Sequence, residues 1–237
     1  MFLVFRWLMR LLTGLIVLGV LCLVVAYYFL SRSLPDYSVD YALPGLSQPV
    51  EIVRNNDNVP HIFGRADADV YYALGFAHAQ DRLWQMTMLR RTAQGRLSEV
   101  FGRRTLKVDE LLRRYDLYTL SLQSVEAQDE PTARALAAYA QGVNAWITQV
   151  NVGARGRGAP EMFFFSNEIA AWQPTDSLAI VKLMALQLST QLETEVRRAR
   201  LSMLLPEARL RDILPDDPGS AVMAAPDYAE LMPGERP

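Results

Sequence analysis

The stretch "GFAHAQDRLWQMTMLRRTAQGRLSEVFG", residues 75–102, decides how the rest of the sequence is interpreted. Its first half continues an apolar pattern with helical spacing, which predicts a helix from about Ala68 with Asp67 as its N-cap. The apolar positions that recur on one face are Val70, Leu74, Ala77, Trp84 and Met88. We expect this face to be buried against the rest of the fold.

The polar side chains of the same stretch raise the question of an active site. Asp81 falls on the apolar face, where a buried carboxylate must find a cation or several N–H donors, so we expect it to be buried, fully bonded and architectural. His78 and Asp81 supply two metal ligands where a closed site needs about four. No "GxSxG" motif marks a serine as nucleophile, so His61 and His78 are expected to be structural and Ser166 a loop residue.

Three other segments carry secondary-structure patterns. Residues 50–63 alternate around the turn-forming "NNDN", which predicts a β-hairpin with Pro60 on an edge strand. A second helix is expected after Asp129 as N-cap, and residues 175–205 predict a third, nearly continuous helix. The apolar face of the second helix contains Leu136, Tyr139, Val143, Trp146 and Val150. A hairpin needs a partner sheet to be stable, so three helices and one hairpin indicate that part of the fold is supplied elsewhere.

The composition limits the class of protein. With 237 residues, 51% hydrophobic and 21% charged, the chain can bury a core in one large domain or two small ones. A net charge of -2, with no basic cluster interleaved with aromatics, argues against nucleic acid as a partner. Cys22 is the single cysteine, which excludes an internal disulfide and a thiolate metal site.

The N-terminal segment predicts a membrane association. Residues 11–31 carry no charge and would span about 31 Å as a helix, which matches a bilayer core of roughly 30 Å. Arg6 and Arg10 precede this stretch, so the positive-inside rule places the following residues outside the cytoplasm. The alternative is a signal peptide cleaved after "VVA", residues 24–26, but the apolar stretch exceeds the usual core of about 7–15 residues and favours an uncleaved transmembrane anchor.

The motifs resemble one known family. "VPHI", "GFAHAQDRLWQM" and "RRTAQGRLSEVFG", followed by "YAQGVNAWI", "WQPTDSLAIVKLMALQLS" and "ETEVRRARL", closely resemble the opening of the penicillin acylase (penicillin amidase) family. The resemblance covers about residues 50–205. It implies an α+β, mainly helical fold class, the α-chain portion of an αββα N-terminal-nucleophile hydrolase, here with an N-terminal transmembrane helix.

The resemblance also implies a division of labour between two chains. In that family one precursor cuts itself into an α chain, a spacer and a larger β chain that begins with the catalytic serine. The α-amine of this serine acts as the base, because its ordinary pKa of about 8 leaves part of it neutral near neutral pH. The resemblance thus implies no catalytic residue in this chain, a β chain from the same precursor as partner, and hydrolysis of the amide bond of an N-acylated small molecule.

The resemblance further implies which residues contact the substrate. Met184, Gln187 and Leu188 match positions that line the acyl-group pocket of the family. Penicillin G acylases carry arginine and phenylalanine where this chain has Gln187 and Leu188. Without that aromatic wall, a longer or aliphatic acyl group, as in the acyl-homoserine-lactone acylases of the family, is as compatible as phenylacetyl.

A calcium ligand is implied in the same way. Glu195 matches an α-chain glutamate that reaches a structural Ca²⁺ otherwise held by the β chain, and Ca²⁺ takes about six to eight oxygen ligands. Glu193 is the lesser candidate for this role. The alternative for Glu195 is an ion pair at helical spacing with Arg198 or Arg200 in solvent.

The resemblance fixes an expected organisation and leaves two rival functions open. We expect residues 1–31 to be an anchor or signal segment, 32–49 a tether, 50–205 the α-chain region and 206–237 a proline-rich tail or spacer. The expected location is the bacterial inner membrane, single-pass, with the folded part on the periplasmic side, or alternatively the periplasm after secretion. The rivals are a catalytically inactive homologue acting as a binding or scaffold protein, and a truncated gene product.

Overall fold

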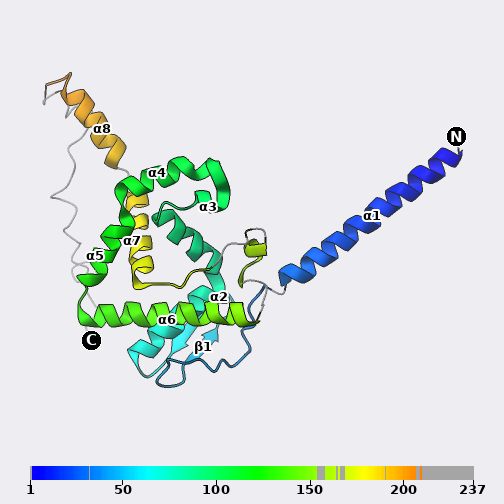
Figure 1. Ribbon diagram of the computed structural model, residues 1–237, viewed down its shortest axis with the longest axis horizontal. Coiled ribbons are helices and arrows are strands. Elements are labelled where there is room, and N and C mark those ends of the chain that lie inside the picture. Colours follow the sequence, from blue (N-terminus) through cyan, green and yellow to red (C-terminus); the bar gives the residue numbers. More distant parts are fainter. Residues whose placement is uncertain are drawn as a thin grey trace, which may run out of the picture. The chain divides into compact units, whose positions relative to one another are not determined.

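The structure is a computed structural model that describes residues 2–31, 33–153, 158–163, 165, 169–189, 191–206 and 209, with backbone alone at 153, 163 and 191–195. The chain divides into two compact units, Met1–Leu186 and Gln187–Pro237. The first unit contains the hairpin and most of the helices (Figure 1).

The first helix, α1 (Phe2–Ser31), is long and apolar enough to cross a membrane, with none of its residues buried against the protein. This property rests on length and composition alone, and an N-terminal signal sequence has the same property. The helix is therefore a candidate membrane span or signal segment.

The predicted hairpin is confirmed. Strand β1 (Glu51–Arg54) pairs antiparallel with β2 (Pro60–Phe63), in the register that places Ile52 opposite Ile62 and Arg54 opposite Pro60. Pro60 is the first residue of β2, a position at which a missing N–H does not break the ladder.

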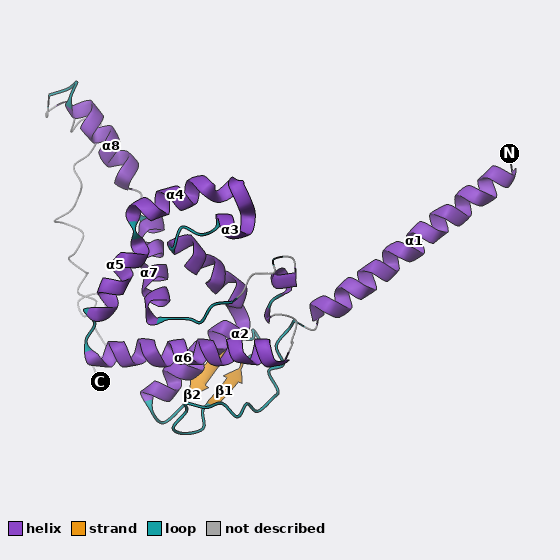
Figure 2. Cartoon of the chain, viewed as in Figure 1, coloured by secondary structure: helices purple, strands orange, loops and turns teal. Residues whose placement is uncertain are grey.

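Two long helices, α2 (Asp67–Ala93) and α6 (Glu130–Gly153), form the centre of the first unit (Figure 2). Glycines allow their backbones to touch. A Cβ atom on Gly75 would lie 2.1 Å from the carbonyl oxygen of Tyr139, and one on Gly142 would lie 1.8 Å from that of Tyr72. The main core cluster extends from this crossing and includes Phe76, Leu83, Val143, Trp146 and Val150.

The predicted buried face is right for α6 and only partly right for α2. Val143, Trp146 and Val150 are buried, and Asp129 accepts the N–H of Thr132 at 2.9 Å as the expected cap. In α2, Ala77 is the one residue of the predicted face that is fully buried. Trp84 of the predicted face is partly buried and packs against the main core cluster. Most of the other buried apolar residues of α2 lie on another face: Tyr72, Ala73, Phe76, Ala79, Leu83 and Met86.

The physical reason is that α2 carries apolar side chains on several faces, so periodicity alone does not select one. The close crossing with α6 selects the face with small residues, such as Ala73 and Gly75, because they let the backbones approach. The predicted cap is also wrong: Ala66 occupies the N-cap position and Asp67 is the first helical residue.

Four short elements between α2 and α6 were not predicted. They are α3 (Ser98–Phe101), the 3-10 helix η1 (Gly102–Thr105), α4 (Leu106–Tyr115) and α5 (Leu117–Glu126). Asp116, in the left-handed region at φ 50°, separates α4 from α5. The buried carboxylate of Asp109 accepts the N–H groups of Leu97 and Ser98 at 2.8 and 2.7 Å, which fixes α4 on the start of α3.

The predicted third helix is two helices. After the 3-10 helix η3 (Pro160–Phe163), α7 (Pro174–Leu188) ends one residue before Ser189, and α8 (Gln191–Ser202) follows. A serine side chain competes with the helical backbone for hydrogen bonds, which favours a helix end at this position.

Much of the expected tether packs on the first unit. The carboxylate of buried Asp69 accepts three hydrogen bonds, from the N–H and hydroxyl of Ser47 at 2.9 and 2.6 Å and from the N–H of Gln48 at 3.2 Å. Tyr41 packs edge-on against Phe76, with 5.2 Å between ring centroids. Residues 37–48, which we call the strap, are thus part of the folded unit.

Candidate functional site

The three predicted pocket residues lie at the C-terminal end of α7. Met184, Gln187 and Leu188 are spaced i, i+3 and i+4, so they share one face of the helix. All three are exposed, Met184 at 51% and Leu188 at 79%. Met184 lines neither the cavity among α2, α6 and α7 nor the groove beside the hairpin.

A buried ion pair holds the start of α7. Asp176 is 1% exposed, and its Oδ2 lies 3.4 Å from a guanidinium nitrogen of Arg90 in α2. The same carboxylate accepts the hydroxyl of Tyr118 from α5 at 3.1 Å and the N–H of Gln173 at 2.8 Å. Arg90 also donates to the carbonyl oxygens of Ala170 and Ala171 at 3.1 and 3.2 Å. Three helices are thus joined at one carboxylate.

The segment that leads into α7 is fixed on α6 as well. The side-chain amide of Asn144 donates to the carbonyl of Trp172 at 2.9 Å and accepts its N–H at 2.7 Å. The indole N–H of buried Trp172 donates to the hydroxyl of Ser177 at 3.0 Å. These bonds and the Arg90–Asp176 pair set the direction of α7, and with it the position of Met184.

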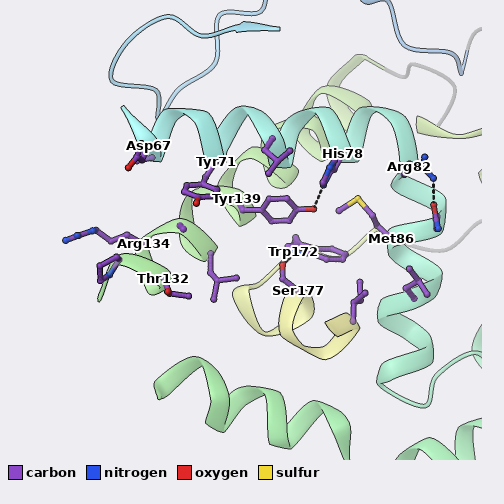
Figure 3. A pocket seen from close by; sticks show the side chains of 18 residues that line it. Asp67, Tyr71, His78, Arg82, Met86, Thr132, Arg134, Tyr139, Trp172 and Ser177 are labelled. Carbon is purple, nitrogen blue, oxygen red and sulfur yellow. Dashed lines mark hydrogen bonds between the residues drawn. The ribbon is translucent and has the colours of Figure 1, made fainter. Parts of the chain in front are cut away.

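An apolar cavity of about 900 Å³ lies among α2, α6 and α7 (Figure 3). In it, His78 points toward Tyr139, with 3.0 Å between the imidazole Nδ1 and the phenol oxygen. Burial lowers the pKa of His78 and raises the pKa of Tyr139 to about 12, so the pair is neutral at neutral pH. Three pairs of polar lining residues bond one another: His78 with Tyr139, Arg82 with Gln85, and Trp172 with Ser177.

Asp81 is bonded as expected but less buried than expected. Its side chain is 21% exposed, and its two oxygens accept a bidentate pair of hydrogen bonds from Arg54 of β1 at 3.0 and 2.9 Å. The hydroxyl of Tyr37 donates to the same carboxylate at 3.0 Å, and the Tyr37 ring lies 3.9 Å from the guanidinium carbon of Arg54. Asp81 faces the strap and hairpin because α2 kinks at the next residue, Arg82, at φ -139°.

Among the described residues we find neither a nucleophile hydrogen bonded to a histidine base nor a metal centre. His61 is exposed in β2, and within the described ranges neither histidine is hydrogen bonded to a serine, threonine or cysteine. Ser166 lies outside the described residues. No group of three or more potential metal ligands is found among the described side chains. Glu195 lies in α8, and its side chain is outside the described part.

Comparison with known proteins identifies the family. The model of the penicillin amidase family matches residues 49–227. This chain belongs to the penicillin amidase family. The match begins near the start of the hairpin and includes α2, α6 and α7.

Curated relatives include acylases of two kinds. Penicillin acylase 2 proenzyme of Pseudomonas sp. (strain SE83) is 37% identical over 160 residues, which are 66% of this chain and 20% of the proenzyme. The acyl-homoserine lactone acylase QuiP of Pseudomonas syringae pv. tomato is 34% identical over 183 residues, 75% of this chain and 21% of that protein. The family therefore consists of acyl-amide hydrolases, and this chain spans about a fifth of the length of these relatives, at their N-terminal portion.

A solved structure agrees with this family. The thermostable penicillin G acylase from Alcaligenes faecalis has a TM-score of 0.59 and 26% identity, over 81% of this chain and 95% of the solved chain. The mainly helical architecture is thus that of a penicillin acylase chain.

The sequence interpretation missed the residues that position α7. Asp176 is the third residue of a helix that begins at Pro174, and its bond to Gln173 is half of a capping box, a signal that the sequence contains. The bond to Arg90 joins residues 86 positions apart and has no local sequence signal.

Proposed function

We propose that this chain is the α-chain portion of an αββα N-terminal-nucleophile hydrolase, which hydrolyses the amide bond of an N-acylated small molecule outside the cytoplasm. The nucleophilic serine then belongs to a β chain from the same precursor. The observation that carries this proposal is the difference in coverage. The chain covers 95% of one solved penicillin G acylase chain but 20% of the penicillin acylase 2 proenzyme.

In this proposal α1 anchors the protein in the inner membrane with the folded part on the periplasmic side. Residues 50–205 form the α-chain region, and residues 206–237 form a spacer or tail. The apolar composition of α1 supports the anchor, and the family match over residues 49–227 supports the α-chain region.

Met184, Gln187 and Leu188 are proposed to form the acyl-facing wall. Their exposure on one face of α7 supports this role, because a wall shared with a second chain is exposed until that chain binds. Leu188→Phe adds an aromatic ring and is expected to raise kcat/KM for phenylacetyl amides relative to long-chain acyl amides. Lys182→Phe, at a partly exposed position on a different face of α7, is the matched control. Equal ratios in both variants would remove Leu188 from the wall.

Glu195 is proposed to supply one oxygen ligand to a structural Ca²⁺. In this proposal the β chain supplies most of the remaining oxygens, since Ca²⁺ takes about six to eight of them. Chelator is expected to lower the Tm of the assembled protein, and Glu195→Gln is expected to abolish this response. Glu193→Gln is the control; if it alone abolishes the response, Glu193 is the ligand.

The proposed function is tested by capturing the tagged chain from cells that express the complete gene. Mass spectrometry is expected to find a second polypeptide, encoded in the same reading frame, that begins with serine. Capture of a single chain, or of a second chain with another first residue, would contradict the proposal.

A further inference from the structure

Little chain separates α1 from the folded part of the first unit. α1 ends at Ser31, and the N–H of Leu34 donates to the carbonyl of Ser31 at 3.3 Å, which turns the chain directly after the helix. The hydroxyl of Tyr41 donates to the carbonyl of Asp36 at 3.2 Å, so the chain is bonded again from Asp36 onward. Pro35 is the single residue between these two bonded segments, and its ring fixes φ.

A clamp of three side chains, Tyr37, Arg54 and Asp81, fixes the strap where it begins. The ring of Tyr37 lies 3.9 Å from the guanidinium carbon of Arg54, which donates two hydrogen bonds to Asp81 at 3.0 and 2.9 Å. The hydroxyl of Tyr37 closes the clamp with a bond of 3.0 Å to Asp81. The side chain of Arg54 is 10% exposed, so salt screens this ion pair little. The strap therefore moves with β1 and α2 and does not lengthen the tether.

The short tether limits the height of the folded part above a bilayer. Five Cα–Cα steps join Ser31 to Asp36, and a fully extended chain covers at most about 18 Å in that number of steps. The uncharged stretch that ends at Ser31 matches the hydrocarbon core, which is covered by a headgroup layer of about 6 Å. Asp36 therefore lies within about 12 Å of the membrane surface when α1 spans the bilayer.

This height also determines which side of the fold points toward the lipid. A compact body of about 150 residues has a radius of roughly 19 Å, and its centre cannot lie closer to the membrane than that radius. Asp36 is exposed at the surface of the fold, and its height of at most about 12 Å is below that of the centre. A second chain enlarges the body and strengthens this limit. The side of the fold that carries the clamp must therefore face the bilayer.

We propose that the clamp holds the folded part against the periplasmic surface of the bilayer, with lipid headgroups as the partner of the surface around Tyr37. This inference rests on the proposed function, in which α1 is an uncleaved anchor. The side chains that follow α1 suit this contact. Leu34, Tyr37 and Val39 are 66%, 44% and 38% exposed, and tyrosine is favoured at the interface between lipid and water.

Energy transfer from the protein to headgroup-labelled lipid tests the inference. The captured two-chain protein is placed in phosphatidylcholine vesicles, with a fluorescent amino acid in place of exposed Asp57 or exposed Glu110. Asn58, next to Asp57, accepts a hydrogen bond from Arg54 at 3.1 Å, so the first probe lies beside the clamp. Glu110 is on α4, which lies away from β1 at the other end of the fold (Figure 1).

Transfer from position 57 is expected to be at least fourfold stronger than transfer from position 110. Equal transfer from both positions, in protein that sediments with membranes, would overturn the inference and leave the anchor and the proposed function standing. Recovery of a chain that begins near Tyr27 would remove the anchor and the inference with it, while amide hydrolysis by the two-chain protein would still support the proposed function.

A longer tether gives a second measurement with a matched control. About 20 Gly/Ser residues inserted between Pro35 and Asp36 span about 25 Å on average, more than the radius of the fold, so the preference for position 57 should fall to less than twofold. The same insertion between Gln128 and Asp129, in the loop before α6, should leave the preference unchanged. Retention of the preference with the longer tether, or equal loss in both variants, would contradict an orientation set by the tether.

Lipid composition separates the tether from charge attraction. The charge of Arg54 is paired with Asp81, and exposed Asp36, Asp40 and Asp57 carry the sign of anionic lipid. Addition of phosphatidylglycerol to the vesicles is therefore not expected to increase the preference for position 57. A preference that appears only with phosphatidylglycerol would assign the contact to charge and overturn the inference.

Discussion

Arg90 and Asp176 illustrate how single side chains position a site that they do not contact. The carboxylate of Asp176 forms an ion pair with α2 and accepts hydrogen bonds from α5 and from the residue before α7. A buried ion pair of this kind contributes little to stability compared with apolar residues in its place. The loss of one partner, however, leaves an uncompensated charge in the interior and is strongly destabilising. We therefore regard the pair as the element that fixes α7 on α2.

Asp176→Ala is expected to lower the free energy of unfolding by about 3–5 kcal/mol, because buried Arg90 loses its counter-ion. The measurement is urea unfolding monitored by circular dichroism. Glu130→Ala, which removes an exposed ion pair with Arg134, is the control and should leave the midpoint nearly unchanged. Similar midpoints for wild type and Asp176→Ala would contradict the positioning role.

His78 is expected to make stability depend on pH. Burial lowers its pKa, with Asp81 opposing and Arg82 reinforcing this effect, so the unfolded chain binds the proton more readily than the folded chain. The stability that His78 contributes is complete above the unfolded pKa of about 6.5 and is lost as the pH falls through the depressed folded pKa. His78→Gln should flatten the fall of Tm between about pH 7 and 5. An unchanged pH profile in His78→Gln would contradict this account.

At the residue scale, local patterns were predictable and long-range partners were not. The Asp129 cap follows from its neighbours, and the structure confirms it. Asp81 was expected to be bonded because a carboxylate on an apolar face needs partners, and it is bonded. Its exposure was not predictable, because it depends on a kink at Arg82 and on the position of Tyr37, 44 residues earlier in the sequence.

The crossing of α2 and α6 is the main determinant at the scale of elements. The helices touch through Gly75 and Gly142, so their separation is set by backbone contact. Sequence periodicity located both helices and the hairpin, because each carries a regular pattern. It did not locate α4 and α5, which are short, or the end of α7, which falls within a continuous apolar pattern.

Gly142→Ala is expected to destabilise the first unit by several kcal/mol, because the new Cβ would lie 1.8 Å from the carbonyl oxygen of Tyr72 and the helices would have to separate. Thermal unfolding measures the effect. Gln141→Ala, at the adjacent exposed position, is the control. A Tm for Gly142→Ala equal to that of the control would show that the close crossing is absent in solution.

At the scale of the whole molecule, exposed apolar surface is concentrated on α1 and recurs on α7, as at Leu188. An apolar helix exposed along its length fits a lipid environment, whereas singly exposed apolar residues are normal on a protein surface. The family and the mainly helical architecture were predictable because they depend on motifs. The role of Met184, Gln187 and Leu188 in lining the acyl-group pocket stays a prediction.

The anchor hypothesis predicts that the protein sediments with membranes and retains its N-terminal sequence. Residues after Ser31 should be accessible to external protease in spheroplasts, because Arg6 and Arg10 favour the cytoplasmic side for the N-terminus. Soluble protein that begins near Tyr27 would instead show that α1 is a cleaved signal peptide.

We propose above that this chain is part of an amide hydrolase whose nucleophile lies on a second chain. The most direct test measures amine release from acyl amides, including a phenylacetyl amide and an N-acyl-homoserine lactone, by the purified chain and by the captured two-chain protein at equal concentration. We expect turnover by the two-chain protein and none above background by the chain alone. Hydrolysis by residues 1–237 alone, or none by an intact assembly with an N-terminal serine, would contradict the account.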